Sequence, residues 1–226
     1  MRATATPRDD LVQRLRSQAD TGARVSQPMA VHPALTGLLD GGLQPGAAYS
    51  VDGGALLLAL LAEPSGSGLW CGVVGIPELG AEAARSAGVV LDRLVLVPKP
   101  GERWLSVVAS LAEALPIVAV RPPSPVRDGD AARLAARLRE RSSVLLVCGD
   151  WPRGAAELRI TRAQWSGLGA GHGYLCGREV TVSVTSRHSG MPRTARMLLP
   201  DANGRLAAGE VSVVEVSRRP RLRAVG

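Results

Sequence analysis

A turn of Asp52, Gly53 and Gly54 stands between an expected strand, residues 47–51, and an apolar helix that opens with three leucines. A chain that leaves a strand, turns through glycines and enters a helix is the frame of a phosphate-binding loop, whose backbone N–H groups hold the phosphates. A nucleoside-triphosphate loop needs four residues after its first glycine, and then a glycine, a lysine and a serine or threonine. Leucines occupy positions 56–58 instead, so this turn is too short to surround a phosphate.

The groups that drive phosphoryl transfer are also missing from this stretch. Lys99 is the only lysine of the chain, and no serine or threonine follows the turn to hold Mg²⁺. We therefore interpret Asp52, Gly53 and Gly54 as a structural turn and a degenerate phosphate loop. The sequence predicts no catalytic residue, no bound cofactor and no metal site, and His32, His172 and His188 are too scattered to suggest a catalytic triad.

Composition indicates one substantial domain with an anionic partner. The 226 residues are 46% hydrophobic, which is enough for a sizeable core. Basic residues outnumber acidic residues 27 to 20, and the net charge of +7 favours either nucleic acid or an acidic protein face. Phenylalanine is absent and aromatic residues make up 3%, which argues against a surface that stacks nucleic-acid bases.

Cysteine usage and hydropathy predict a cytoplasmic protein. Cys71, Cys148 and Cys176 lie far apart in apolar runs, so buried free thiols are favoured over a disulfide or a metal set. The first residues lack the apolar segment of an export signal, and no apolar run approaches the roughly 18 residues of a membrane span. We expect neither export nor membrane insertion.

Strand and helix patterns alternate through the middle of the chain and predict an α/β fold. A mostly parallel sheet flanked by helices follows from this order, because parallel strands need helical crossovers. The sequence predicts strands at residues 69–76, 94–97, 117–120 and 144–147, and helices at residues 79–88, 102–115 and 130–141.

The two ends of the chain have different patterns. Polar and apolar residues alternate at 155–165, 179–187 and 194–199, which predicts antiparallel edge strands in hairpins, with the glycines at 167–173 in a hairpin loop. Residues 1–34 read as an N-terminal helix with Leu11 on its apolar face and a linker arm. Residues 206–226 read as a strand, at 210–216, and a basic tail. The expected core is residues 35–205.

Several phrases in this order resemble the RecA core family. They are residues 87–92 (AGVVLD), which end a helix, residues 94–98 (LVLVP), which form a strand, and the Gly101-Glu102 helix start. The resemblance extends over residues 35–205 and implies a RecA-like core. The chain departs from the family at the catalytic positions. The position of the family's catalytic Glu falls on Ile76, and the strand that corresponds to Walker B is followed by Arg121 and has no Asp. The loops that contact DNA in RecA correspond to residues 122–129 and to the much shorter 150–154.

A RecA-like chain without a nucleotide site, rich in Arg and Ala, is similar to the ImuA group of mutasome proteins. That resemblance implies a non-catalytic adaptor in damage-induced translesion DNA synthesis. The implied partner is an ImuB-type inactive relative of Y-family polymerases and, through it, an error-prone replicative-type polymerase and the sliding clamp. Weak nonspecific DNA contact is also expected. The family's partner contact lies toward its C-terminus, which here corresponds to Arg218, Arg219, Arg221 and Arg223.

Two further readings remain open at this point. One is a SulA-like inhibitor of cell division acting on FtsZ, since that family also resembles a RecA core without a phosphate loop. The other is a working ATPase, which the single lysine disfavours. Among the tryptophans, Trp104 is expected in the core, whereas Trp151 and Trp165 lie in or beside loops and are candidates for a partner surface. The arginine tail is equally compatible with a solvated end.

Overall fold

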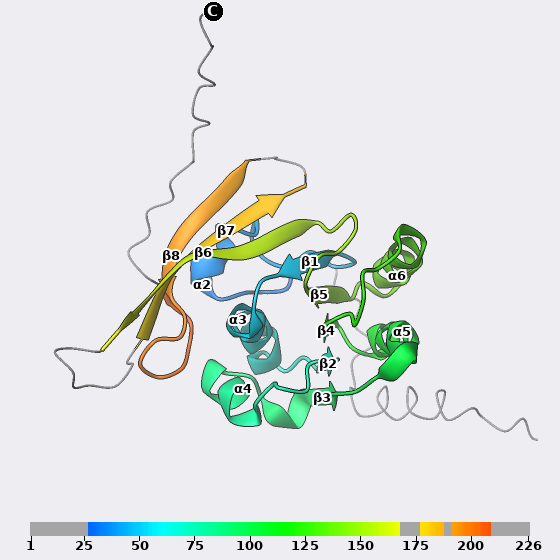
Figure 1. Ribbon diagram of the computed structural model, residues 1–226, viewed down its shortest axis with the longest axis horizontal. Helices are drawn as coiled ribbons and strands as arrows, with labels where there is room; N and C mark the ends of the chain where they lie inside the picture. Colours follow the sequence, from blue (N-terminus) through cyan, green and yellow to red (C-terminus); the bar gives the residue numbers. More distant parts are fainter. Residues whose placement is uncertain (1–26, 168–176, 188–190, 209–226) are drawn as a thin grey trace, which may run out of the picture.

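The computed structural model describes residues 27–167, 177–187 and 191–208. Across these residues the chain forms one mixed sheet in the order β3-β2-β4-β5-β1-β6-β7-β8-β9, with helices on both faces (Figure 1). From β3 to β6 in this order, neighbouring strands pair in parallel, and from β6 to β9 they pair antiparallel. The predicted α/β fold, mostly parallel with antiparallel C-terminal strands, is confirmed.

The parallel strands are short and mostly apolar, and all of them except β3 are largely buried. Strands covered on both sides lose the polar alternation of edge strands, which is why they read as continuous apolar runs. They are β1 (Ala48–Val51), β2 (Cys71–Val74), β3 (Leu94–Val97), β4 (Ile117–Val120) and β5 (Val144–Cys148). The remaining strands are β6 (Ala156–Ser166), β7 (Gly177–Ser186), β8 (Pro192–Leu198) and β9 (Ala207–Ala208).

The helices divide the interior into two hydrophobic cores. The first core lies between the sheet and α2 (Pro33–Thr36), α3 (Gly54–Gly66) and α4 (Ala81–Ala87). The second lies on the opposite face, under α5 (Trp104–Ala114) and α6 (Asp128–Arg141). Short 3-10 turns precede β3 and α5, at Leu91–Arg93 and Gly101–Arg103. Buried side chains from β6, β7 and β8 belong to the first core, which therefore spans both halves of the sheet.

α3 is the central helix, and its sequence explains its position. The run GALLLALLA is apolar on every side, and its five leucines are all buried. A helix without a polar face is stable only inside a core. α6 is the opposite case, because only Ala131, Leu134 and Leu138 are buried and the rest of its surface is charged or small.

The N-terminal arm packs against its own core where it is described. Met29 and Val31 are buried, and the backbone of Met29 pairs with Leu43 in an isolated antiparallel bridge. The expected helix around Leu11, the expected strand at 210–216 and the arginine tail lie outside the described residues. The domain boundaries at 34/35 and 205/206 stay predictions.

Within the described residues, the expected elements lie within a few residues of their observed bounds, with four additions. The sequence reading did not assign α2, β9 or the two 3-10 turns. Trp104 and Cys71 are buried as expected, and Cys71 is a free thiol. Burial raises the pKa of Cys71 to about 12, so the thiol stays protonated and unreactive.

Candidate functional site

The turn after β1 is as short as its sequence predicts. β1 ends at Val51 and α3 begins at Gly54, so only Asp52 and Gly53 connect them. The Asp52 N–H donates to the carbonyl of Leu158 on β6, 2.9 Å away, and Gly53 takes a φ of 84°, which favours glycine. The backbone therefore turns directly into the helix, with no loop in which amides could converge on a phosphate.

A polar cleft of about 330 Å³ lies beside this turn. It is formed where β1, β4 and β5 end and β6 begins, at the carboxyl edge of the parallel strands, which is where open α/β sheets bind ligands. Its charged lining residues are Asp52, Arg121, Asp150, Glu157 and Arg159, and the half-buried Cys148 also contributes. The position of the cleft is suitable for a ligand, and the charges of its lining residues determine which ligands it could bind.

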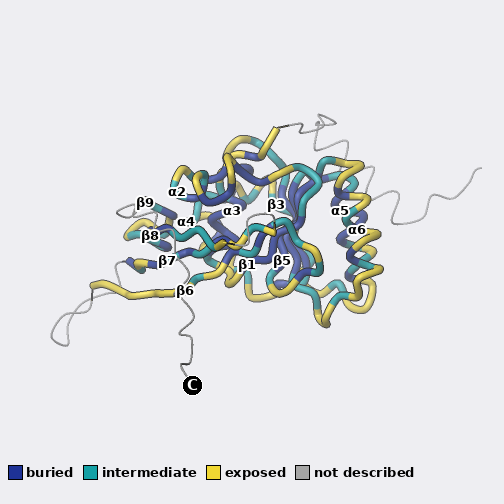
Figure 2. Tube along the Cα trace, turned by 90° about the horizontal axis from the view of Figure 1, so that it is seen from above, coloured by how far each residue is buried: buried dark blue, intermediate teal, exposed yellow. Residues whose placement is uncertain are grey.

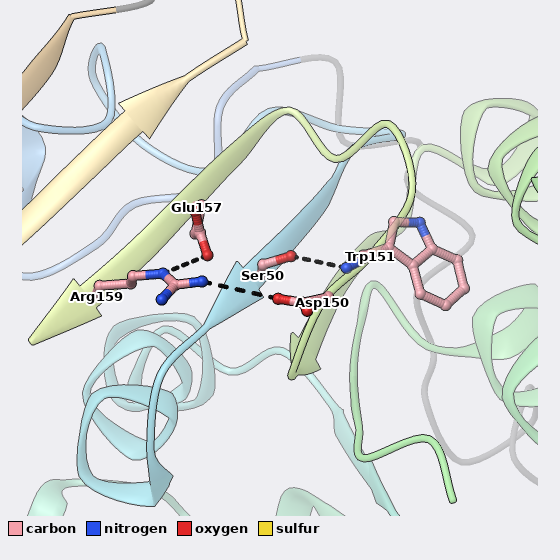
Figure 3. A network of polar contacts seen from close by, with 5 residues as sticks. All are labelled: Ser50, Asp150, Trp151, Glu157 and Arg159. Carbon is pink, nitrogen blue, oxygen red and sulfur yellow. Dashed lines mark hydrogen bonds and ion pairs between the residues drawn. The ribbon is translucent and has the colours of Figure 1, made fainter. Parts of the chain in front are cut away.

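Both arginines of the cleft already have carboxylate partners. Arg159 pairs with Glu157, a neighbour on the same face of β6, and its Nη2 lies 3.8 Å from Oδ1 of Asp150 (Figure 3). The hydrogen bond to Glu157 raises the pKa of Arg159. Arg121, directly after β4, pairs with Glu78 from the loop after β2. That hydrogen bond lowers the pKa of Glu78, so the pair is charged at neutral pH.

This charge arrangement disfavours a nucleotide. An incoming triphosphate would meet the carboxylates of Asp52, Asp150 and Glu157 and would have to compete for guanidinium groups that are already paired. Arg121 also places a positive charge directly after β4, where the sequence resemblance implies a carboxylate. Burial raises the pKa of the Cys148 thiol, although Arg121 opposes this, so the thiol is a weak nucleophile at neutral pH.

Neither Lys99 nor Ile76 lies among the residues that line the cleft. Lys99 follows β3, and β3 is separated from β1 by three strands, or roughly 19 Å at the usual strand spacing. Ile76, at the position of the catalytic Glu, is buried in the first core. Within the described part of the chain, no group of three or more His, Cys, Asp or Glu side chains could hold a metal ion.

Trp151 is buried, which corrects the expectation of an exposed tryptophan beside the loop. The residue is 7% exposed and packs into the second core, and its backbone N–H donates to Oγ of Ser50 at 3.1 Å (Figure 3). The hydrogen bond to Ser50 holds the residue against β1, where its side chain packs in the second core. Trp165 is 50% exposed near the end of β6, with the Arg178 guanidinium 5.7 Å from the centre of its ring.

The remaining candidates are placed only in part. Arg218, Arg219, Arg221 and Arg223 lie outside the described residues, as do His172 and His188. The two segments that correspond to DNA-contacting loops are described, and the second one, residues 150–154, borders the cleft through Asp150. Within the described ranges, every helix is too short or too polar to cross a bilayer.

Sequence reasoning missed the ion-pair network of the cleft. A signal was present, because Arg121 and Asp150 each follow a predicted parallel strand and such strands end at the same edge of a sheet. The roles of Glu157 and Arg159 had no such signal, because their position depends on β6 pairing in parallel with β1.

Comparisons with known proteins support a family but name no activity. The chain is 31% identical to the uncharacterized protein Rv3395c of Mycobacterium tuberculosis over 126 residues, which is 55% of this chain and 56% of that protein. It thus spans about half the length of this curated relative. A solved structure, SulA from Pseudomonas aeruginosa, is 19% identical and matches 46% of this chain and 98% of its own, with a TM-score of 0.40.

A family model matches the middle of the chain. The MT3502 N-terminal domain matches residues 37–153, which is just over half of the sequence. The match extends from the end of α2 to the loop that holds Trp151, so it includes the turn after β1, β4 with Arg121, and α6. The chain belongs to the MT3502 N-terminal domain family.

Proposed function

We propose that the protein is a non-catalytic adaptor built on a RecA-like core. The sheet order β3-β2-β4-β5-β1 supports this core, because it places the turn after β1 at the centre of the carboxyl edge, where such a core holds its nucleotide. The antiparallel strands after β6 agree with the hairpins expected from the family's final strands. The resemblance in residues 87–102 lies in the segment from the end of α4 to the turn before α5.

The observation that carries the proposal is the state of the cleft. A two-residue connection replaces the phosphate loop, and the cleft contains two arginines that are both neutralised by the protein's own carboxylates. A working NTPase needs an unpaired cation at the phosphates and a carboxylate for Mg²⁺. The cleft has carboxylates, but both of its arginines are paired with the protein's own carboxylates, so its described residues offer no free cation to a triphosphate. The role that remains for this fold is assembly.

The partner we propose is an ImuB-type inactive relative of Y-family polymerases, in cytoplasmic translesion synthesis. Through that partner the protein joins an error-prone replicative-type polymerase and the sliding clamp. The predicted contact is the tail with Arg218, Arg219, Arg221 and Arg223. Trp165 replaces Trp151 as the tryptophan anchor, because it is exposed and Trp151 is not.

One binding experiment tests the adaptor role. An ImuB-type partner is co-purified with the full chain and with a chain that ends at Gly209. Retention by the full chain alone supports the role and the tail contact, and retention by both moves the contact onto the core. If neither chain retains the partner and the same preparation blocks FtsZ polymerisation, the alternative of a SulA-like division inhibitor replaces the proposal.

A second experiment tests the loss of the nucleotide site. A ligand that binds only the native state raises stability, by about 2.7 kcal/mol at a hundredfold excess over its Kd. We expect the melting temperature to be the same with and without Mg-ATP. A clear rise that depends on ATP concentration would contradict the proposal.

A further inference from the structure

Within the described residues, the antiparallel strands have one face that neither hydrophobic core covers. Along β7, Val180, Val182 and Val184 point into the first core, and the residues between them point the other way. Neither core contains a side chain from that second face. In Figure 1, α5 and α6 lie beside the parallel strands, and Figure 2 shows much of β6 exposed. We call this uncovered side of β6, β7 and β8 the open face.

A β-bulge places Arg162 on the open face. Leu158 and Ile160 pack against the first core, so simple alternation would turn Arg162 inward as well. The register shifts between Ile160 and Arg162, which leaves Thr161 as the extra residue, and Arg162 pairs with Thr181. The Thr161 hydroxyl donates to the Thr181 carbonyl at 3.2 Å and supports the bulge. Bulges commonly redirect a side chain in this way.

Arg162 is one end of a row across three strands. Thr181 pairs with Arg162 on one side and with Arg196 of β8 on the other, so the arginines flank a threonine on the same face. Two strand spacings put their backbones about 10 Å apart. The row lines a hollow of about 420 Å³, together with Gln164 and Glu179.

The two arginines of this row differ from other arginines of the sheet. Arg159 and Arg193 each have a carboxylate partner. Within the described residues, Arg162 and Arg196 have none, and both side chains are exposed. The Thr181 hydroxyl lies between these two guanidinium groups and the Gln164 amide lies beside them. Together they form a binding site for anions.

We propose that the open face binds an acidic polypeptide segment of the adaptor's partner, with carboxylates on Arg162 and Arg196. The inference rests on the proposed function and names the chemistry of its partner. A peptide fits better than nucleic acid because Glu179 lies beside the two arginines and would repel a continuous row of phosphates. The carboxylates of a polypeptide can be spaced to meet the arginines and avoid Glu179.

The test uses the full chain and two probes. One is a fluorescein-labelled peptide of Glu-Thr repeats, compared with the same peptide carrying Gln for Glu. The other is a single-stranded oligonucleotide of mixed sequence. Arg162→Gln with Arg196→Gln is compared with Arg103→Gln and Arg127→Gln, two exposed arginines at the starts of α5 and α6 that change the net charge equally. Melting temperatures check that each variant folds.

Fluorescence anisotropy should show the acidic peptide binding about tenfold more weakly to the Arg162/Arg196 variant, as expected for two lost ion pairs. The Arg103/Arg127 variant should bind like the original chain. The proposal is overturned if the peptide does not bind, if both variants lose equally, or if only oligonucleotide binding depends on the row.

Partner capture separates this inference from the proposed function. If the original chain and the Arg162/Arg196 variant retain the ImuB-type partner equally, the docking surface is wrong and the adaptor role stands. If the original chain retains no partner, the proposed function fails whatever the peptide does. Loss of capture in the Arg162/Arg196 variant alone supports both.

Discussion

Ser50 joins two elements through a single buried hydrogen bond. It lies on β1, and its Oγ accepts a hydrogen bond from the backbone N–H of Trp151, in the loop after β5, at 3.1 Å. The loop borders the cleft, and the bond fixes its first residues against the end of the sheet (Figure 3). When a buried N–H loses its acceptor, the free-energy cost of removing that group from water is no longer offset.

The variant Ser50→Ala should therefore destabilise the protein by about 1–3 kcal/mol, which is the cost of one unsatisfied buried donor. Urea unfolding followed by circular dichroism measures this as a lower midpoint with an unchanged slope. Ser124→Ala, at an exposed position in the loop after β4, is the matched control and should leave the midpoint unchanged. Equal midpoints for the two variants would show that water or another group replaces Ser50.

At the scale of elements, an ion pair ties the N-terminal part of the chain to β8. Both Nη atoms of Arg193 bond the Asp40 carboxylate, at 2.6 and 2.8 Å, and Nη1 also donates to the Gly37 carbonyl at 3.1 Å. The hydrogen bonds from Arg193 lower the pKa of Asp40. The segment after α2 is thereby held against a strand more than a hundred residues later.

This pair predicts a pH-dependent effect of Asp40→Asn. Because folding lowers the pKa of Asp40, the stabilisation is present above the carboxyl's unfolded pKa of about 3.9 and is lost as pH falls through the folded value. The carboxylate is exposed, so the loss at pH 7 should be no more than about 1 kcal/mol. Urea midpoints at pH 7 and pH 3 measure it, with Asp92→Asn as the control; a difference that does not shrink at pH 3 would contradict the ion-pair explanation.

A close backbone approach fixes the bridge between Met29 and Leu43. A Cβ added to Gly42 would lie 2.2 Å from the Met29 carbonyl oxygen, and Gly42 has a φ of 147°. Gly42→Ala should separate the two segments and cost more than the roughly 1–3 kcal/mol of backbone strain alone. Gly37→Ala is the control, because its φ is −68° and a Cβ there would have open space. Thermal unfolding compares them, and similar melting temperatures would contradict the contact.

The elements followed from local patterns, and their long-range partners did not. Apolar runs identified the parallel strands because burial on both faces leaves a signature in each run alone. The short α2 has no such signature, since its four residues are held by a proline start and the His32 cap. β9 is two residues long, and only its pairing with β8 defines it. Pairing between distant segments is not encoded in any one of them.

For the candidate site, the sequence revealed what was missing more readily than what replaced it. The short turn after β1 and the absence of a nearby lysine could be read from spacing. The sequence also shows Arg121 where the resemblance implies a carboxylate. Its pairing with Glu78, however, depends on β2 and β4 being neighbours. Trp151 was misjudged because a residue beside a loop can still turn inward, and the direction of one indole is set by packing.

At the scale of the whole molecule, the two halves of the sheet form one structural unit. β6 pairs in parallel with β1 and antiparallel with β7, so it belongs to both halves. The first core includes α3 together with buried residues of β7 and β8. Neither half could separate without exposing this core and breaking the pairing of β6.

The described residues should therefore unfold in one cooperative step. Trp104 and Trp151 lie in the second core, so tryptophan fluorescence mainly reports the parallel half, whereas far-ultraviolet circular dichroism reports the whole sheet. If the halves are coupled, both signals should give the same urea midpoint and slope, which is the test of a two-state transition. If the antiparallel strands were an independent unit, the dichroism would change in two steps and the fluorescence in one. Ser50→Ala sharpens the comparison, because its bond lies in the parallel half and a coupled molecule must shift both signals together.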